Sequence, residues 1–201
     1  NSETSAVLTT EPTASSTAST TTNVGTVDIN AAGGLDNNYD FTYVKGTLSI
    51  NKATITVTAD AKSRDYGDAN PTFTISYSGF KNSETSAVLT VEPSVSSIAT
   101  TTTIVGTVDI DVAGGLDDNY DFTHVKGTLT IGKAAITVTA DDKSKTFGDA
   151  NPAFTLSYSG FKNSETSEVL TVEPSASSIA TTTTNVGTVD IDVAGGLDNN
   201  Y

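Results

Sequence analysis

Acidic side chains are the residues of this chain whose spacing is most suggestive of chemistry. Five of them lie in one 13-residue segment that contains Gly114-Gly115: Asp109, Asp111, Asp117, Asp118 and Asp121. Asp109 and Asp111 are two positions apart, so in a strand they share one face. Calcium takes about six to eight oxygen ligands, which loops rich in Asp, Asn and Gly supply. One interpretation is therefore a calcium site, and the other is a solvated polar strand face followed by an ordinary turn.

A second polar group surrounds another predicted strand and the Asn70-Pro71 turn. Its members are Asp60, Asp65, Asp68 and Asn70. A cation bridging neighbouring modules at this place would stiffen an array of them. The alternative is that an Asp at a strand end and a Gly67-Asp68 turn need no ion.

The residues needed for catalysis are missing from this sequence. Cysteine is absent, which removes thiolate nucleophiles and thiolate zinc sites. His124 is the only histidine, and Tyr43 occupies its position one repeat earlier, which argues against a general base or a metal ligand. No Ser-His-Asp set and no Gly-rich phosphate loop can be assembled. We therefore expect a protein that is not an enzyme, with calcium as its only candidate cofactor.

Four lysines raise the question of a covalent isopeptide crosslink, because such a bond joins a buried Lys to a buried Asn or Asp. They are Lys45, Lys52, Lys126 and Lys133. All four lie beside a glycine or at a module end, so we expect them to be exposed and unlinked.

The charge balance excludes several classes of partner. The formal net charge is −14, with ten Lys and Arg residues in 201. Nucleic acid and acidic membrane surfaces both require clusters of basic side chains, so neither is expected to bind. No apolar run approaches the ~18 residues that span a bilayer, and no signal peptide is visible. The chain is therefore interpreted as an internal piece of a longer protein.

An internal repeat is the strongest feature of the sequence. Residues 1–9 return at 82–90 and again, with one change at Glu168, at 163–171, so the offset is 81 residues. The strand pattern places a complete module at 53–133. Residues 1–52 are then the C-terminal part of a preceding repeat, and 134–201 a module without its last strands. We expect these two parts to expose core surface unless neighbouring chain or a partner copy completes them.

The expected elements are short strands. Apolar residues alternate with Thr, Ser or Asp, a period of two, over 55–59, 73–77, 108–112, 120–122 and 129–131. Five or more such strands in about 80 residues predict an all-β fold, a tandem array of small Ig-like β-sandwich modules. A single turn of helix is expected within 82–89, capped by Asn82 or Ser83. The Ser/Thr tract 13–22 is interpreted as an ordered strand or edge, because Ile98 and Ile104 stand at aligned positions, and O-glycosylation is the alternative.

These landmarks resemble a known family. The run from Ala134 to Pro152, and Asp65-Tyr66-Gly67-Asp68 in the preceding copy, are similar to the opening of the MBG/YDG-type repeats of large bacterial surface adhesins. Ser78-Gly79-Phe80, Val105-Gly106-Thr107 and the run 127–134 match later landmarks in order. The resemblance implies secreted, tandemly arrayed modules on a bacterial cell surface. It supplies no catalytic residues.

Two functions follow from these expectations. The first is a structural stalk or filament that extends or presents a distal part of an adhesin, its partners being neighbouring repeats of the same chain or identical chains. The alternative is that each repeat itself binds a glycan or protein on a host or neighbouring cell. Sugar binding would require exposed aromatic rings, for which Tyr43, Tyr66 and Tyr77 are the candidates.

Overall fold

A computed structural model describes residues 3–201 of the chain; Asn1 and Ser2, which begin the first copy of the repeated motif, lie outside the described residues. The described part is built from strands, turns and three single 3₁₀ turns, so the predicted all-β repeat fold is confirmed. It divides into two compact units. Within the described range, unit 1 comprises 3–58, 75–94 and 112–125, and unit 2 comprises 59–74, 95–111 and 126–201. Strands are assigned below to the unit that holds most of their residues.

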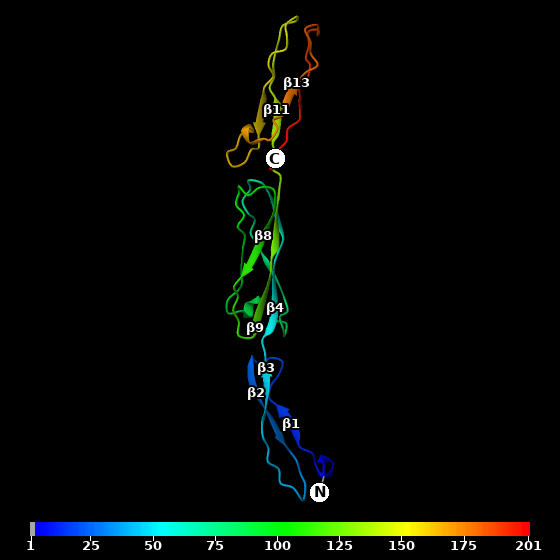
Figure 1. Cartoon of the computed structure of the whole chain (residues 1–201), viewed down its shortest axis with the longest axis vertical. Coiled ribbons are helices and arrows are strands. Elements are labelled where there is room, and N and C mark those ends of the chain that lie inside the picture. Colours follow the sequence, from blue (N-terminus) through cyan, green and yellow to red (C-terminus); the bar gives the residue numbers. More distant parts are fainter. Residues whose placement is uncertain (1–2) are drawn as a thin grey trace. The chain divides into compact units, whose positions relative to one another are not determined.

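Unit 1 contains two three-stranded sheets (Figure 1). In the first, β1 (Thr13–Ser16), β2 (Gly25–Ala32) and β3 (Gly46–Ile50) pair antiparallel in the order β1-β2-β3. In the second, β4 (Ala53–Ala59) lies between β6 (Ile75–Ser78) and β9 (Tyr120–Val125), and it runs parallel to β9. Because apolar residues alternate with Thr along β4, Ile55 and Val57 face inward and are fully buried.

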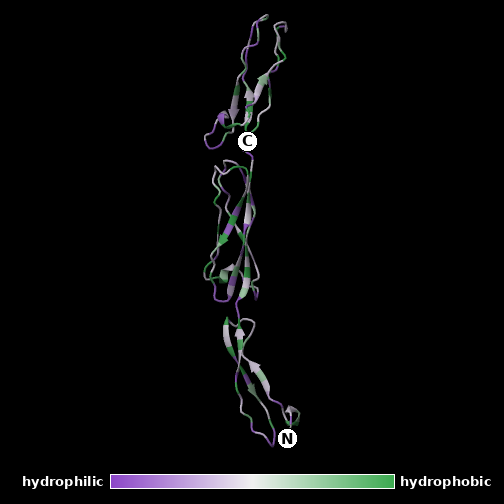
Figure 2. Cartoon of the chain, in the orientation of Figure 1, coloured by the Kyte–Doolittle hydropathy of each residue, from purple (hydrophilic) through white to green (hydrophobic). Residues whose placement is uncertain are grey.

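Unit 2 contains a four-stranded sheet and two pairs of strands. The order in the larger sheet is β5-β10-β8-β7, formed by Lys62–Asp65, Gly127–Gly132, Gly106–Ala113 and Ser94–Ser96. β11 (Thr137–Ala140) pairs with β12 (Leu156–Ser159), and β13 (Ser175–Ser177) pairs with β14 (Asp192–Ala194), both antiparallel. Hydropathy alternates along many of these strands (Figure 2). Ile110, Leu129 and Ile131 accordingly form the buried core of the larger sheet.

Parallel pairing between the first and last strands of the middle repeat was not predicted. Tyr120 pairs with Ala53 in β9 and β4, and Leu129 pairs with Lys62 in β10 and β5, an offset of 67 residues in both pairs. Gly127 begins β10, as expected for the break after β9. A Cβ atom on Gly127 would lie 2.5 Å from the carbonyl oxygen of Ala59, so only glycine lets the two backbones approach this closely.

Two local expectations were wrong in detail. The helical turn is a 3₁₀ turn at Ser86–Val88, matched by Ser5–Val7 and Ser167–Val169, and Thr85, rather than Asn82 or Ser83, precedes it without a side-chain cap. Asn82 and Ser83 instead adopt left-handed backbone angles, with φ of 53° and 61°. The strand predicted at 73–77 begins at Ile75, and residues 69–74, which include Asn70-Pro71, form neither a strand nor a turn.

The Ser/Thr tract is ordered at its start. Thr13–Ser16 forms β1, which agrees with the structural interpretation of the tract. Ile98 and Ile104, whose apolar character favoured that interpretation, are nevertheless exposed, so they do not contribute to a core.

The three repeats bury aligned positions to different extents. Leu129 is fully buried in the middle repeat, whereas the aligned Leu48 is 37 % exposed. Val112 is buried, whereas the aligned Val193 is 37 % exposed. The same side chain therefore lies in a closed core in one copy and at the surface in another, which agrees with the expectation that the outer segments expose core surface.

Candidate functional site

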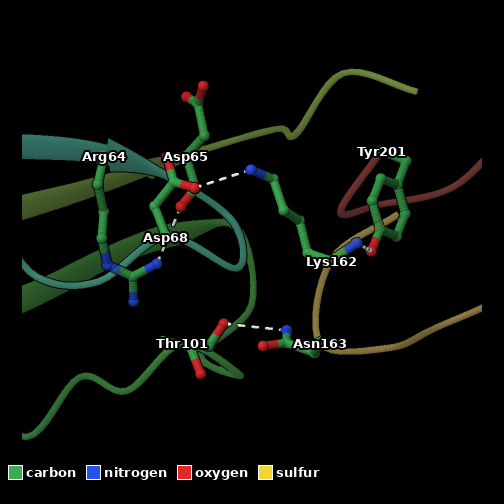
Figure 3. A network of polar contacts seen from close by, with 7 residues as sticks. All are labelled: Arg64, Asp65, Asp68, Thr101, Lys162, Asn163 and Tyr201. Carbon is green, nitrogen blue, oxygen red and sulfur yellow. Dashed lines mark hydrogen bonds and ion pairs between the residues drawn. The ribbon is translucent and has the colours of Figure 1, made fainter. Parts of the chain in front are cut away.

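The Tyr-Gly-Asp signature of the sequence lies where one repeat meets the next. In unit 2, the loop Tyr66–Asp68, here named the head loop, follows β5 and contacts residues of the third repeat (Figure 3). It is fixed to its own repeat by two backbone hydrogen bonds, from Tyr66 N to Gly132 O (2.8 Å) and from Gly67 N to Thr101 O (3.1 Å). We name this set of contacts between the second and third repeats the second junction.

Tyr66 contributes a buried phenol to the second junction. It is 4 % exposed, and its hydroxyl donates to Glu165 Oε1 over 2.7 Å. Its ring meets that of Tyr201 edge to face, with centroids 5.6 Å apart, and the Tyr201 hydroxyl donates to the other oxygen, Glu165 Oε2. The hydrogen bond to Glu165 raises the pKa of Tyr66, while burial is the main cause that raises the pKa of Tyr201 to about 12. One carboxylate thus joins phenols from two repeats.

Gly67 and Asp68 accommodate one lysine of the next repeat. Gly67 has a φ of +81°, and a Cβ atom there would lie 2.1 Å from Lys162 Cβ, so a larger residue would displace the lysine stem. The Lys162 ammonium lies 2.9 Å from Asp68 Oδ1. Glycine therefore makes room for the lysine, and the aspartate pairs with its charge.

Arg64 supports the head loop from within its own repeat. Its guanidinium is almost buried and donates to Asn70 Oδ1 (2.8 Å), Asp65 O (3.0 Å) and Thr100 O. Asn70 Nδ2 in turn donates to Ala99 O over 2.7 Å. These bonds satisfy the buried charge, which is a requirement for burying it at low cost.

The junction between the first and second repeats, which lies in unit 1, has two hydrogen bonds in common with the second junction. Asn82 Nδ2 donates to Thr20 O (2.9 Å), and Val24 N donates to Asn119 Oδ1 (2.9 Å). In unit 2 the residues 81 positions later repeat both bonds: Asn163 to Thr101 (3.2 Å) and Val105 to Asn200 (3.1 Å). The first junction therefore shares these two hydrogen bonds with the second, whereas the contacts of the head loop occur in the second alone within residues 3–201.

Three of the four residues considered for a bridging ion have protein partners for their side chains. Asp68 pairs with Lys162, Asn70 accepts from Arg64, and Asp60 accepts from the Thr74 hydroxyl. The cation that joins the modules at Asp68 is thus a lysine ammonium. Metal binding by this group remains an untested expectation.

The five aspartates predicted to bind calcium have separate surroundings. Asp109 and Asp111 each lie 2.9 Å from the Lys126 ammonium, and their hydrogen bonds raise the pKa of that lysine. Asp117 is buried, and its Oδ1 accepts from Asn119 N (2.8 Å) in a turn. The remaining two, Asp118 and Asp121, are exposed, and Asp121 lies 3.8 Å from Lys52.

Within residues 3–201 no three His, Asp or Glu side chains are arranged to hold a metal ion. Calcium binding by the five aspartates stays a prediction. The lysines are held by surface partners: Lys45 by Asp28 and Lys126 by Asp109, with Lys52 and Lys133 donating to the carbonyls of Asp117 and Asp198.

His124 contacts the backbone of a turn and a neighbouring aromatic ring. It is exposed, its Nε2 lies 2.9 Å from Gly114 O, and its ring is stacked near that of Phe122. The aligned Tyr43 likewise stacks near Phe41, and its hydroxyl accepts from Gly34 N. Both side chains therefore close the same Gly-Gly turn.

One known family model matches each of the three repeats of the chain. The family model described as MBG domain (YGX type) matches residues 1–49, 55–130 and 136–201. The chain belongs to the MBG domain family. Searches of curated proteins and of solved structures found no match. MBG repeats are typical of surface proteins, and no helix within residues 3–201 is long and apolar enough to cross a membrane.

The MBG signature now has a structural role in this chain. Tyr66 and Gly67 supply its Tyr-Gly pair, and both contact the following MBG repeat. Sequence reasoning singled out this loop but missed its partners, Lys162, Glu165 and Tyr201. These partners recur as Lys81, Glu84 and Tyr120 at the 81-residue offset, but most of the repeat recurs in the same way, so the sequence carries no signal that singles them out.

Proposed function

We propose that these MBG repeats form a structural stalk or filament of a secreted bacterial surface adhesin, one that extends or presents a distal functional part of that protein. The observation that carries this proposal is the recurrence of one junction. The bonds Asn82–Thr20 and Val24–Asn119 in unit 1 return as Asn163–Thr101 and Val105–Asn200 in unit 2. A junction that repeats with the sequence lets each added repeat join its neighbour in the same way.

The remaining features support a mechanical role without catalysis. The second junction joins repeats through a buried phenol, a carboxylate and a lysine, and His124 closes a turn. The expected partners are therefore neighbouring repeats of the same chain or identical chains.

Small-angle X-ray scattering tests the proposal. The 201-residue chain is compared with chains lengthened by one and by two further 81-residue repeats. A stalk requires the maximum dimension to grow by a similar step each time, about 30–40 Å if strands of about ten residues run along the array. A maximum dimension that does not grow with repeat number would overturn the proposal.

A glycan array tests the alternative, in which each repeat binds a ligand. Of the three tyrosines considered as stacking platforms, Tyr66 is buried in the second junction and Tyr77 packs near Phe80 with centroids 5.7 Å apart. Tyr43 remains exposed, and His124 replaces it in the next repeat. Specific glycan binding that is lost in the Tyr43→Ala variant would favour the binding-module function over the stalk.

A further inference from the structure

Unit 1 contains a cavity at the position that corresponds, one repeat earlier in the sequence, to the place of the head loop in the second junction. It has a volume of about 140 Å³ and is lined by residues 20–24, Ile50 and Asn51 of the first repeat and by a group of the second repeat that includes Lys81, Glu84 and Tyr120. Moving 81 residues along the chain converts these last three into Lys162, Glu165 and Tyr201, which are the partners of Tyr66 and Asp68. A cavity of roughly 150 Å³ accommodates one aromatic ring, which matches the ring that Tyr66 places among those partners.

The polar groups that the head loop satisfies in unit 2 are free in unit 1. Glu84 Oε2 accepts from the Tyr120 hydroxyl, but its Oε1, the counterpart of the oxygen that accepts from Tyr66, makes no hydrogen bond to a residue within 3–201. The Lys81 ammonium likewise forms no ion pair in the described part of the chain, whereas Lys162 pairs with Asp68. Glu84 Oε1 can therefore accept a hydrogen bond from a hydroxyl, and the Lys81 ammonium can pair with a carboxylate.

The strand beside the cavity has an open edge. In unit 2, β10 is flanked by β8 on one side and by β5, which leads directly into the head loop, on the other. In unit 1, the aligned β3 pairs with β2 alone and forms the edge of its sheet. An exposed edge offers unpaired backbone groups to an added strand.

From these three observations we propose that the edge of β3 and the adjoining cavity form a docking site for a strand and loop of the type Lys-Ser-Arg-Asp-Tyr-Gly-Asp, as found at residues 62–68. The strand adds parallel to β3, in the register by which Lys62 pairs with Leu129. The tyrosine hydroxyl donates to Glu84 Oε1, the aspartate pairs with Lys81, and the glycine makes room for the lysine stem. The site rests on contacts inside unit 1 and does not depend on whether the array is a surface stalk.

The test uses the 201-residue chain, labelled with ¹⁵N, and a synthetic peptide with the sequence of residues 59–70. Titration should shift the amides of Leu48, Asn51 and Glu84 in a saturable manner. A peptide with Phe in place of Tyr66 loses a hydrogen bond to a charged acceptor and should bind about tenfold more weakly. A peptide with Val in place of Gly67 should not bind, because its side chain would occupy the space of the lysine stem.

Two variants of the chain provide a matched control. Lys81→Ala should weaken binding of the peptide, whereas Lys162→Ala, which changes the aligned residue of the occupied second junction, should leave its affinity unchanged. Absence of saturable shifts, or equal binding of the natural peptide and its Gly67→Val form, would overturn the proposal. The chain could instead associate with itself in a concentration-dependent manner that the peptide does not inhibit. That result would assign the edge of β3 to a second copy of the chain and would also overturn the proposal. Loss of the docking site would leave the scattering result for the stalk unchanged, so the two proposals fail separately.

Discussion

At the scale of single residues, Gly67 shows why the signature of these repeats requires glycine. Two causes act together, the φ of +81° and the contact with Lys162. Gly148, the aligned residue of the third repeat, has a φ of +94° but no atom within 4 Å of its would-be Cβ. A comparison of Gly67 with Gly148 therefore distinguishes the effect of backbone strain from the effect of the contact between repeats.

Gly67→Ala is predicted to destabilise the chain more than Gly148→Ala. Both variants carry the left-handed backbone cost of about 1–2 kcal/mol, and Gly67→Ala adds a steric cost of about 1–3 kcal/mol against Lys162. Chemical denaturation of both variants measures the difference. Equal losses would show that contact between the head loop and the next repeat contributes nothing to stability.

Tyr201 makes the stability of unit 2 sensitive to alkaline pH. Its pKa is about 12 in the folded chain and 10.0 ordinarily, so the folded state holds the phenolic proton more tightly. The contribution is fully present below about pH 10 and is lost as the pH rises through about 12. Denaturation midpoints should fall across that window, and Tyr201→Phe should make the fall shallower. A decline of the same steepness in the variant would assign the effect to other groups.

Calcium binding can be tested through Lys126, whose ammonium forms ion pairs with both Asp109 and Asp111. If the predicted site exists, Lys126→Ala removes a competing cation, so calcium should raise the thermal midpoint of this variant more than that of the natural chain. Midpoints are compared in millimolar calcium and in chelator. Identical midpoints in both solutions, for both proteins, would reject the site.

At the scale of elements, the parallel pairing of first and last strands depends on Gly127. A Cβ atom at Gly127 would lie 2.5 Å from Ala59 O, whereas at the aligned Gly46 the nearest atom, Ile29 Cβ, lies at an ordinary 3.5 Å. Gly127→Ala should therefore cost about 1–3 kcal/mol, and Gly46→Ala should change stability by less than about 0.5 kcal/mol. Chemical denaturation distinguishes them, and similar values would mean that β9 and β10 tolerate a wider separation from the first strand.

The strands also show how far local patterns predict elements. Alternation of apolar and polar residues predicted the strands at 55–59, 108–112 and 129–131 because one face of each is buried. It missed the start of β6 and the residue that precedes the 3₁₀ turn, because the alternation of apolar and polar residues does not mark where an element begins. It also carried no information about which strands pair, since an offset of 67 residues is set by packing of distant segments.

At the scale of the whole molecule, the middle repeat should be the most protected part of the chain. Its Ile110, Leu129 and Ile131 are buried, while Leu48 and Val193, at positions aligned with buried residues, are exposed. Native-state hydrogen exchange should therefore give the slowest amides in β8 and β10, with faster exchange in β3 and β14. Equal protection in all three repeats would show that the outer segments are as stable as the middle one.

The sequence alone determined the all-β class, through the period-two alternation of its strands, and the 81-residue repeat and the family resemblance, through recurring runs of residues. It also drew attention to Tyr66, Gly67 and Asp68. Only the tertiary structure decided what that loop does, since its partners Lys162, Glu165 and Tyr201 lie 94, 99 and 135 residues away along the chain and meet it through packing of separate repeats. The five aspartates show the converse, because carboxylates close in sequence acquired different partners once strand direction and turns had set where each side chain points.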